Sequence, residues 1–422
     1  MEVKKGFKQT EVGVIPGDWD IVPLKKLTTK IGSGITPTGG ERVYIKEGRP
    51  FTRSQNVGWG TLLLDDIAFI DEQTHATFSA TEIKLNDVLL NITGASIGRS
   101  AVADSRLQGG NVNQHVCIIR VDGSSLDPSF LNLFLLSKNG QKQIDSFQAG
   151  GNRQGLNFGQ IKSFQIPVPP LPEQLFIAVA LSDVDALLAI LDALIAKKGF
   201  IKQGAMQELL TGKRRLPGFR GEWETLYMAE HSTLKARIGW QGLTTAEYLS
   251  TGEYRLITGT DFIDGKVNWE ECHFVEKNRY DQDKNIQVHI GDVLVTKDGT
   301  IGKITYIDQL PSKATLNSGV FVIRPKNNKY LPLYFYCVLR SKIFDDFLRQ
   351  LQAGSTINHL YQKDFVNFNF PAPKYEEQEA IAEILSDMDA EIAALEKKRE
   401  KTRLLKQGMM QELLTGRIRL IS

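Results

Sequence analysis

Two stretches of the chain carry apolar residues alternately four and three positions apart, the spacing of a helix face that packs against a second helix. No proline interrupts the chain between Pro172 and Thr211, and Gly212 and Gly416 stand where left-handed residues end helices. We therefore expect two helices of about 40 residues, each about 60 Å long at 1.5 Å per residue. The predicted contact positions, called the seam below, are Ile177, Leu181, Val184, Leu188, Leu191, Ile195, Ile381, Leu385, Met388, Ile392 and Leu395.

The two helices belong to an internal repeat. Residues 169–216 align without a gap to the segment 204 positions further on, and 25 of the 48 aligned residues are identical. With a one-residue slip, the alignment continues upstream, where Asn86–Gly98 matches Gly291–Gly302. A match of this extent indicates a duplication. The boundaries that follow are an N-terminal arm 1–16, a first globular domain 17–168, a central helical region 169–216, a second globular domain 217–372 and a C-terminal helical region 373–422.

An isolated helix with a seam of this length needs a partner, and the duplication supplies one. Antiparallel pairing of the two helices would give the chain a pseudo-two-fold axis. The alternative is two core helices of separate domains. Gly199, which aligns with Arg403, predicts a weaker or bent segment, and the charged run 396–403 is interpreted as a solvated face.

The globular domains have diverged while the helical regions have not, so the helices should face similar partners and the domains different targets. The strands expected are 87–92, 116–121, 292–296 and 320–324. The helices expected are 128–138, 141–147 and 331–351. The fold class predicted is α+β, with two mixed α/β globular domains separated by two long antiparallel helices.

Polar loops in both domains suit contact with nucleic acid. Glycine loops at 94–99 and 298–303 each end in a basic residue, and glycine allows a phosphate backbone to approach the main chain. Arg, Asn and Gln side chains can read base edges through paired hydrogen bonds. The alternative is ordinary polar surface loops. The candidate DNA-contacting residues are Arg53, Gln55, Asn56, Ser96, Arg99, Asn111, Asn113, Gln114, Asn152, Arg153, Gln154, Lys235, Arg237, Gln241, Lys297, Lys303, Asn317, Thr356, Asn358 and His359.

The composition limits how strongly this chain can bind DNA alone. Its 422 residues include 51 Lys and Arg against 49 Asp and Glu, a net charge of +2. Residues 17–168 carry 15 basic and 14 acidic side chains, and residues 217–372 carry 18 of each. Neither domain is basic overall, so DNA contacts must be local and partner subunits should neutralise much of the phosphate charge.

Cysteine usage and hydropathy point to a cytoplasmic protein. Its three cysteines lie far apart in the sequence and fit neither a disulfide framework nor a zinc site. The stretch 175–195 is apolar but carries three aspartates, which argues against a membrane span.

No catalytic or metal-binding motif is recognisable. The segment Gly299–Lys303 lacks the spacing of a nucleotide-binding P-loop. The signature of adenine-N6 methyltransferases, Asn or Asp followed by two prolines and an aromatic residue, is absent. The histidines have no metal-ligand spacing. We therefore expect no catalytic residue, metal or cofactor in this chain.

The order of its motifs resembles the specificity subunit of type I DNA restriction-modification systems. The similar segments are Lys8–Trp19, Ile166–Gln174 and the Gln-Glu-Leu-Leu-Thr-Gly strings that begin at Gln207 and Gln411. The resemblance covers essentially the whole chain. It implies two target-recognition domains that each read one half of an asymmetric bipartite site in double-stranded DNA, and a coiled coil that sets the spacer between the halves.

The same resemblance implies the partners. The coiled coil would dock modification subunits, two of them, which bind S-adenosylmethionine and methylate adenine. Restriction subunits would add ATP- and Mg-dependent translocation and cleavage. Two other functions remain open: a self-sufficient methyltransferase or nuclease, against which the missing motifs argue, and a coiled-coil scaffold whose two divergent domains bind ligands other than DNA.

Overall fold

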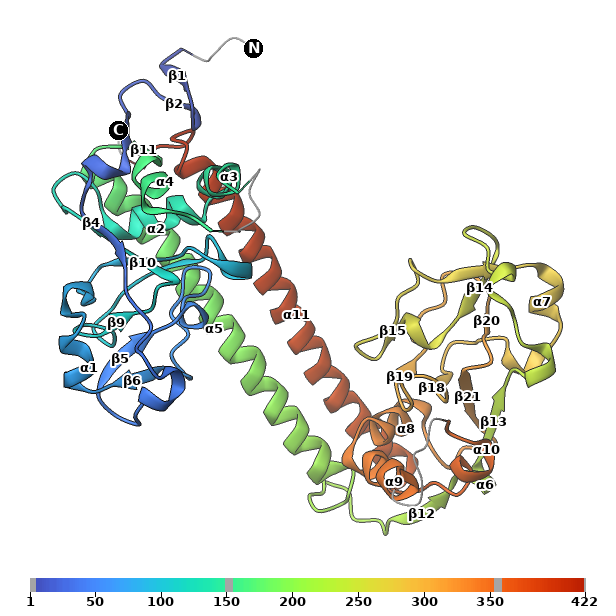
Figure 1. The fold of residues 1–422 in the computed structure, drawn as a ribbon. Helices are drawn as coiled ribbons and strands as arrows, with labels where there is room; N and C mark the ends of the chain where they lie inside the picture. Colours follow the sequence, from blue (N-terminus) through green and yellow to red (C-terminus); the bar gives the residue numbers. More distant parts are fainter. Residues whose placement is uncertain (1–4, 149–154, 353–358, 421–422) are drawn as a thin grey trace. The chain divides into compact units, whose positions relative to one another are not determined.

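The chain divides into two compact units. The structure, a computed structural model, describes residues 5–148, 155–352 and 359–420. Unit 1 comprises residues 1–191 and 398–422, and unit 2 comprises residues 192–397. Both boundaries fall inside long helices, α5 (Leu171–Leu209) and α11 (Tyr375–Leu413) (Figure 1). Each unit therefore joins one globular part to the first half of one helix and the second half of the other.

Unit 1 is built on a four-stranded antiparallel sheet in the order β4-β10-β7-β8. Its strands are β4 (Thr28–Ser33), β10 (Val116–Val121), β7 (Val88–Asn91) and β8 (Ser100–Val102). A second sheet has the order β6-β5-β9 and contains Ala68–Ile70, Arg49–Thr52 and Asn111–Val112, with β5 and β9 parallel. The strands predicted at 87–92 and 116–121 are confirmed as β7 and β10.

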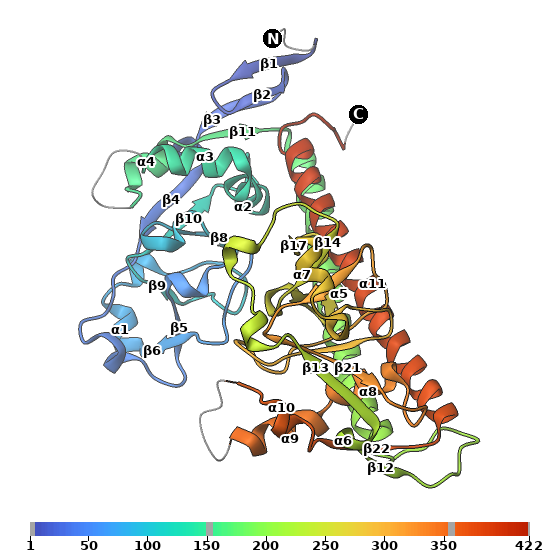
Figure 2. The same cartoon turned by 90° about the vertical axis from the view of Figure 1, so that its right-hand side faces the viewer.

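Shorter elements complete unit 1. Strand β3 (Asp20–Pro23) pairs with β11 (Gln165–Val168), and β1 (Phe7–Thr10) forms a hairpin with β2 (Gly13–Pro16) (Figure 2). The helices are α1 (Glu72–Ala76), α2 (Pro128–Leu136), α3 (Lys138–Ser146) and α4 (Phe158–Ser163). The core brings together Phe130 and Phe134 of α2, Ile177 and Leu181 of α5, and Leu413 at the end of α11.

Unit 2 repeats this topology despite its different sequence. Its four-stranded sheet has the order β13-β21-β18-β19, with Ser232–Ala236, Val320–Pro325, Val293–Thr296 and Ile304–Tyr306. Its second sheet has the order β17-β14-β20, with His273–Val275, Tyr254–Ile257 and Ala314–Leu316. Strand β12 (Glu224–Tyr227) pairs with β22 (Asn369–Ala372), as β3 pairs with β11. The strands predicted at 292–296 and 320–324 are confirmed as β18 and β21.

The described part of unit 2 also contains a two-stranded hairpin and several short α-helices. The hairpin is β15 (Phe262–Ile263) with β16 (Lys266–Val267). The helices are α6 (Met228–His231), α7 (Lys277–Asp281), α8 (Pro332–Leu339), α9 (Lys342–Gln352) and α10 (Gln362–Phe365). The single helix predicted over 331–351 is wrong. The chain breaks at Ser341, whose buried hydroxyl donates to the carbonyl of Val338 and accepts the N–H of Ile343 at 3.2 Å.

Within each unit the two half-helices lie side by side and antiparallel. In unit 2, Lys198 pairs with Glu391 at 2.7 Å, and Lys202, one turn further along α5, pairs with Asp389, which lies earlier in α11. In unit 1, Lys406 pairs with Asp185. All eleven predicted seam residues are buried or half-buried. Helix α5 continues unbroken through Gly199.

In each unit, a matching set of contacts ties the segment that follows one long helix to the beginning of the other. In unit 1 the guanidinium of Arg419 donates to the fully buried carboxylate of Glu173, and to Asp18 at 3.0 Å. The indole N–H of Trp19 donates to the same Glu173 carboxylate at 3.2 Å. These hydrogen bonds raise the pKa of Arg419 and lower that of Asp18. Gly416 at φ +65° ends α11 here, and a side chain in its place would collide with Pro16.

Unit 2 contains the equivalent contacts 204 residues away. Arg215 donates to both carboxylate oxygens of Glu377, at 2.7 and 2.6 Å, and lies over the ring of Trp223. Gly212 at φ +70° ends α5, as predicted. The Pro-x-x-x-Glu-Gln and Gln-Glu-Leu-Leu-Thr-Gly motifs therefore meet in each unit, and each comes from a different copy of the repeat.

Helix α5 is long and apolar enough to cross a membrane, by length and composition only. A single helix of this kind is weak evidence for a membrane protein. Its ion pairs to α11 and its aspartates fit a helix packed against protein.

Candidate nucleic-acid interface

Three loops of unit 1 converge on one edge of the main sheet. They are residues 34–38, 93–99 and 113–115, called loop cluster 1. The N–H of Gly34 donates to the carbonyl of Asn113 at 3.3 Å, and that of Ile92 to His115 at 3.0 Å. Thr93 forms a bridge with Gly155. The chain just after residues 149–154 therefore joins the same edge.

Unit 2 brings together the counterparts of two of these loops and, as a third segment, residues that correspond to the chain at 155–157 rather than to loop 34–38. The three segments are residues 297–303, 317–319 and 359–361, called loop cluster 2. The N–H of Lys297 donates to the carbonyl of Gly319 at 2.8 Å, and that of Leu360 to Lys297 at 2.8 Å. Asp298 forms a bridge with His359, equivalent to the Thr93–Gly155 bridge. The two corresponding loops share their backbone framework and differ in their side chains, and cluster 1 adds loop 34–38.

Cluster 1 carries a network of neutral polar groups. The hydroxyl of Thr36 donates to the side-chain oxygen of Gln114. The amide nitrogen of Gln114 donates to Nε2 of His115 at 3.1 Å, and Nδ1 of His115 lies 2.6 Å from the hydroxyl of Thr93. Gln114 is exposed and the other three are half-buried. An amide is thus held in one orientation at the surface.

Cluster 2 carries charged and aromatic groups instead. Asp298 contacts Nδ1 of His359, and its carboxylate lies 3.5 Å from the ammonium of Lys297. The ring of His359 lies 4.5 Å from that of Tyr361, centre to centre. The Lys297 ammonium lies 5.6 Å from the ring of Phe321, and only 14% of the Lys297 side chain is exposed. The two clusters therefore offer different chemistry on one framework.

Arg99 and Lys303 occupy equivalent positions at the ends of the glycine loops. Their carbonyls accept hydrogen bonds from the N–H groups of Asn91 and Thr296, at 2.8 and 2.9 Å. Both side chains are half-buried, and Nε of Arg99 has no hydrogen-bond partner among the described residues.

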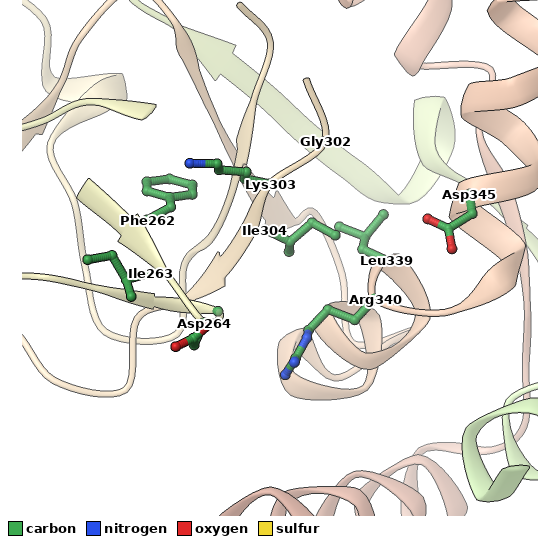
Figure 3. Close-up of a pocket in the computed structure, with 10 residues that line it drawn as sticks. Phe262, Ile263, Asp264, Gly302, Lys303, Ile304, Leu339, Arg340 and Asp345 are labelled. Carbon is green, nitrogen blue, oxygen red and sulfur yellow. The ribbon is translucent and has the colours of Figure 1, made fainter. Parts of the chain in front are cut away.

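The Lys303 side chain lines a cavity of about 490 Å³ in unit 2. Lys303 and Phe262 lie on one side of it, and Arg340 and Asp345 approach from the α8–α9 junction (Figure 3). Arg340 is engaged by the hydroxyl of Tyr336 at 2.8 Å. The cavity therefore mixes both signs of charge and is not a simple anion site.

Four predicted DNA contacts lie buried inside the fold. Asn111 is fully buried, and its amide binds His75 at 2.6 Å and the carbonyl of Phe78 at 3.2 Å. Arg237 is 2% exposed and donates to the carbonyl of Leu316 at 2.9 Å, and burial lowers its pKa. The side chains of Asn111 and Arg237 are already hydrogen-bonded inside the fold, so we no longer count these two residues as DNA-contacting candidates. Asn56 and Gln241 are also buried; the amide nitrogen of Asn56 donates to the carbonyl of Leu63 at 2.9 Å, and the side-chain oxygen of Gln241 has no hydrogen-bond partner among the described residues.

Among the remaining predicted residues that the structure describes, Asn113 is also buried and the others are half-buried or exposed. Arg53 and Gln55 both bind Asp66, at 3.2 and 2.6 Å. Asn113 and Asn317 shape equivalent turns, since their side-chain oxygens accept the N–H of His115 at 3.0 Å and of Ser318 at 2.7 Å. Half-buried Ser96 belongs to loop cluster 1, and exposed Lys235 lies on β13. Asn152, Arg153, Gln154, Thr356 and Asn358 lie outside the described residues.

Sequence reasoning missed several members of the clusters. Thr36, Thr93 and Asp298 were not among the candidates, although Thr93 and Asp298 align with each other in the repeat, one residue before a glycine. That alignment was the available signal. Among the described residues, no three His, Cys, Asp or Glu side chains form a group that could hold a metal ion.

The structure defines a duplicated protein whose two units share a topology and differ in the side chains of their loop clusters. The family described as type I restriction modification DNA specificity domain matches residues 16–197 and 243–405. The chain therefore belongs to the type I restriction-modification DNA specificity family.

Relatives span the whole chain. The chain is 25% identical to the type I restriction enzyme MjaX specificity subunit of Methanocaldococcus jannaschii, and the alignment covers 99% of this chain and 97% of that subunit. It is 23% identical to the type I restriction enzyme MjaVIII specificity subunit of the same organism, with 99% of this chain and 96% of that subunit covered. The crystal structure of the type I S subunit from M. genitalium superposes with a TM-score of 0.60 at 16% identity and 98% coverage of both chains. A structure from a study of type I system assembly gives 0.57 at 18% identity, covering 96% and 99%. These structural likenesses concern the fold.

Proposed function

We propose that each unit reads one half of an asymmetric bipartite DNA site through its loop cluster. The observation that carries this is the shared backbone framework with different side chains. An amide network stands in cluster 1 where lysine, aspartate and histidine stand in cluster 2. Two units with the same backbone and different side chains in their loops would read two different half-sites. The centres of these half-sites would lie about one helical turn of DNA apart.

The two helices set the distance between the readers. One antiparallel register accounts for the ion pairs in both units, Lys202–Asp389 and Lys406–Asp185. This supports pairing of α5 and α11 as a coiled coil along their full length, and hence a fixed spacer in the DNA site.

The outer face of α5 is the surface we propose for a modification subunit. Its part in unit 1 exposes apolar side chains that the seam does not use, namely Leu175, Phe176, Val179, Leu187 and Ile190. Beside them lies a cavity of about 390 Å³, which Leu133 of α2 and Leu175 help to line. Such a face suits the apolar side of a partner helix.

Catalysis belongs to the partners in this proposal. The chain supplies recognition, while modification subunits bring S-adenosylmethionine and flip and methylate an adenine. Restriction subunits bring ATP and Mg²⁺. The near balance of charge in each unit fits a reader that binds DNA firmly only within such a complex.

The proposal is tested by mapping methylated adenines across the genome of cells that express this chain with its modification subunit. We expect one split, non-palindromic motif with a spacer of constant length. A continuous motif, or methylation without sequence preference, would contradict the proposal. A non-DNA scaffold would give no change in methylation at all.

A further inference from the structure

We infer that Gln114 reads the major-groove edge of an adenine in the half-site of unit 1, and that Thr36 and His115 position its amide for that contact. The inference rests on the proposed function. It assigns one residue to one base and explains why the two units differ there.

The geometry of the network fixes which atoms remain available. The amide nitrogen of Gln114 can only donate, so Nε2 of His115 accepts and Nδ1 carries the proton toward Thr93. The amide oxygen of Gln114 accepts from Thr36. One N–H and one lone pair of the amide are then still unused.

That remaining pair is what adenine requires. In the major groove adenine presents an acceptor, N7, beside a donor, the N6 amino group, and a glutamine amide binds both at once. Guanine presents two acceptors at this edge, and would leave the amide oxygen facing another oxygen. An amide held in advance loses less conformational freedom on binding than one on a free side chain.

The duplicated unit supplies the contrast. Position 318 aligns with Gln114 and holds Ser318, and Gly319 aligns with His115. Unit 2 therefore has neither the amide nor the ring at this place, and its cluster presents Asp298 and His359 in a neighbouring loop. A glutamine kept only for the fold would not need to be exposed, as Gln114 is.

The test uses the chain assembled with its modification subunits and duplex DNA libraries in which each base pair of the site is randomised in turn. Gln114→Ala should reduce the preference for A·T at one position of one half-site by about tenfold or more. Gln114→Glu, which replaces the amide donor by an acceptor, should shift that preference toward cytosine. The half-site of unit 2 should keep its preferences with both variants.

Positioning is tested by Thr36→Val, with Thr38→Val on the same loop as the matched control. Thr36→Val should weaken discrimination at the same base pair as Gln114→Ala, and Thr38→Val should leave it unchanged. Unaltered preferences with Gln114→Ala, beside an intact bipartite site, would overturn this inference and leave the proposed function standing. If the unaltered complex showed no preference for a bipartite DNA site, the proposed function itself would be contradicted.

Discussion

Lys202 of α5 binds the carboxylate of Asp389 in α11, and 204 residues along the repeat Lys406 binds Asp185. Each contact lies within one unit. Lys202 is only 8% exposed, so its ammonium is largely removed from water and the carboxylate of Asp389 compensates for the lost solvation. The duplication has thus kept both halves of an ion pair on both helices, which is expected if each copy must pair with the other.

Reversing this charge should loosen the helix pairing in unit 2. Lys202→Glu places two carboxylates together and should lower the free energy of unfolding by about 1–2 kcal/mol, and adding Asp389→Lys should restore about 1 kcal/mol. Chemical unfolding of the four chains of this double-mutant cycle measures the coupling. The control is Arg403→Glu. Arg403 is more than half exposed and pairs with Glu400 on the same helix, so this reversal should change the free energy of unfolding little.

Arg419 should matter for unit 1 far more than its neighbour Arg417. Among the described residues, Arg419→Met leaves the buried Glu173 carboxylate with only the Trp19 indole as a side-chain donor, and should cost about 2–4 kcal/mol. Arg417→Met removes an exposed pair to Glu412 and should cost less than about 0.5 kcal/mol. Hydrogen exchange resolved by unit should show the loss in unit 1.

Arg215→Met should produce the matching effect in unit 2, through Glu377. If either single variant destabilised both units equally, the Arg419–Glu173 and Arg215–Glu377 contacts would not be acting independently in their own units, contrary to this account.

The chain should tolerate circular permutation. In unit 1 the contacts of Arg419 with Asp18 join the two ends of the chain, at the place where unit 2 connects Arg215 to Trp223 through continuous backbone. Joining residue 420 to residue 5 through a short linker, which keeps the β1–β2 hairpin with its buried Ile15, and opening the chain between 216 and 222 should give a protein with the same DNA motif. A permuted chain that assembles with its partners but methylates a different motif would argue against this closure.

Lys303 and Arg99 should contribute to binding without choosing the sequence. If each touches phosphate, Lys303→Ala or Arg99→Ala should weaken binding uniformly across sequences. Each variant should also reduce by about 1 the slope with which the logarithm of the binding constant falls with the logarithm of salt concentration. Titrations of the assembled complex at several salt concentrations measure this. Loss of preference at a single base pair would assign the residue to base reading instead.

The repeat and the helix lengths were predictable from sequence because a heptad pattern and a strong internal match are local signals. The glycine helix ends were predictable for the same reason. The mixed α/β character of the units followed from four strands whose β-branched runs are plain in the sequence. The break at Ser341 was missed because its apolar flanks continue the helical pattern, and a serine that caps the next turn leaves little trace.

The site was predicted only in part, and burial explains why. Asn111 and Arg237 have the side chains of base readers, yet both end inside the fold, where His75 and the Leu316 carbonyl take their hydrogen bonds. Sequence patterns distinguish residue types and not which side of a loop faces water. Thr36 joined the cluster through a contact with Gln114 across 78 positions, which no local pattern encodes.

The central claim is that each unit reads its own half-site, and a chain with two identical readers tests it most directly. Residues 217–372 would be replaced by a second copy of residues 17–168, and methylated adenines mapped in cells that also express the modification subunit. The account predicts a bipartite palindrome, with the unit 1 half-site repeated in inverted orientation around the original spacer. Retention of the original asymmetric motif would contradict it.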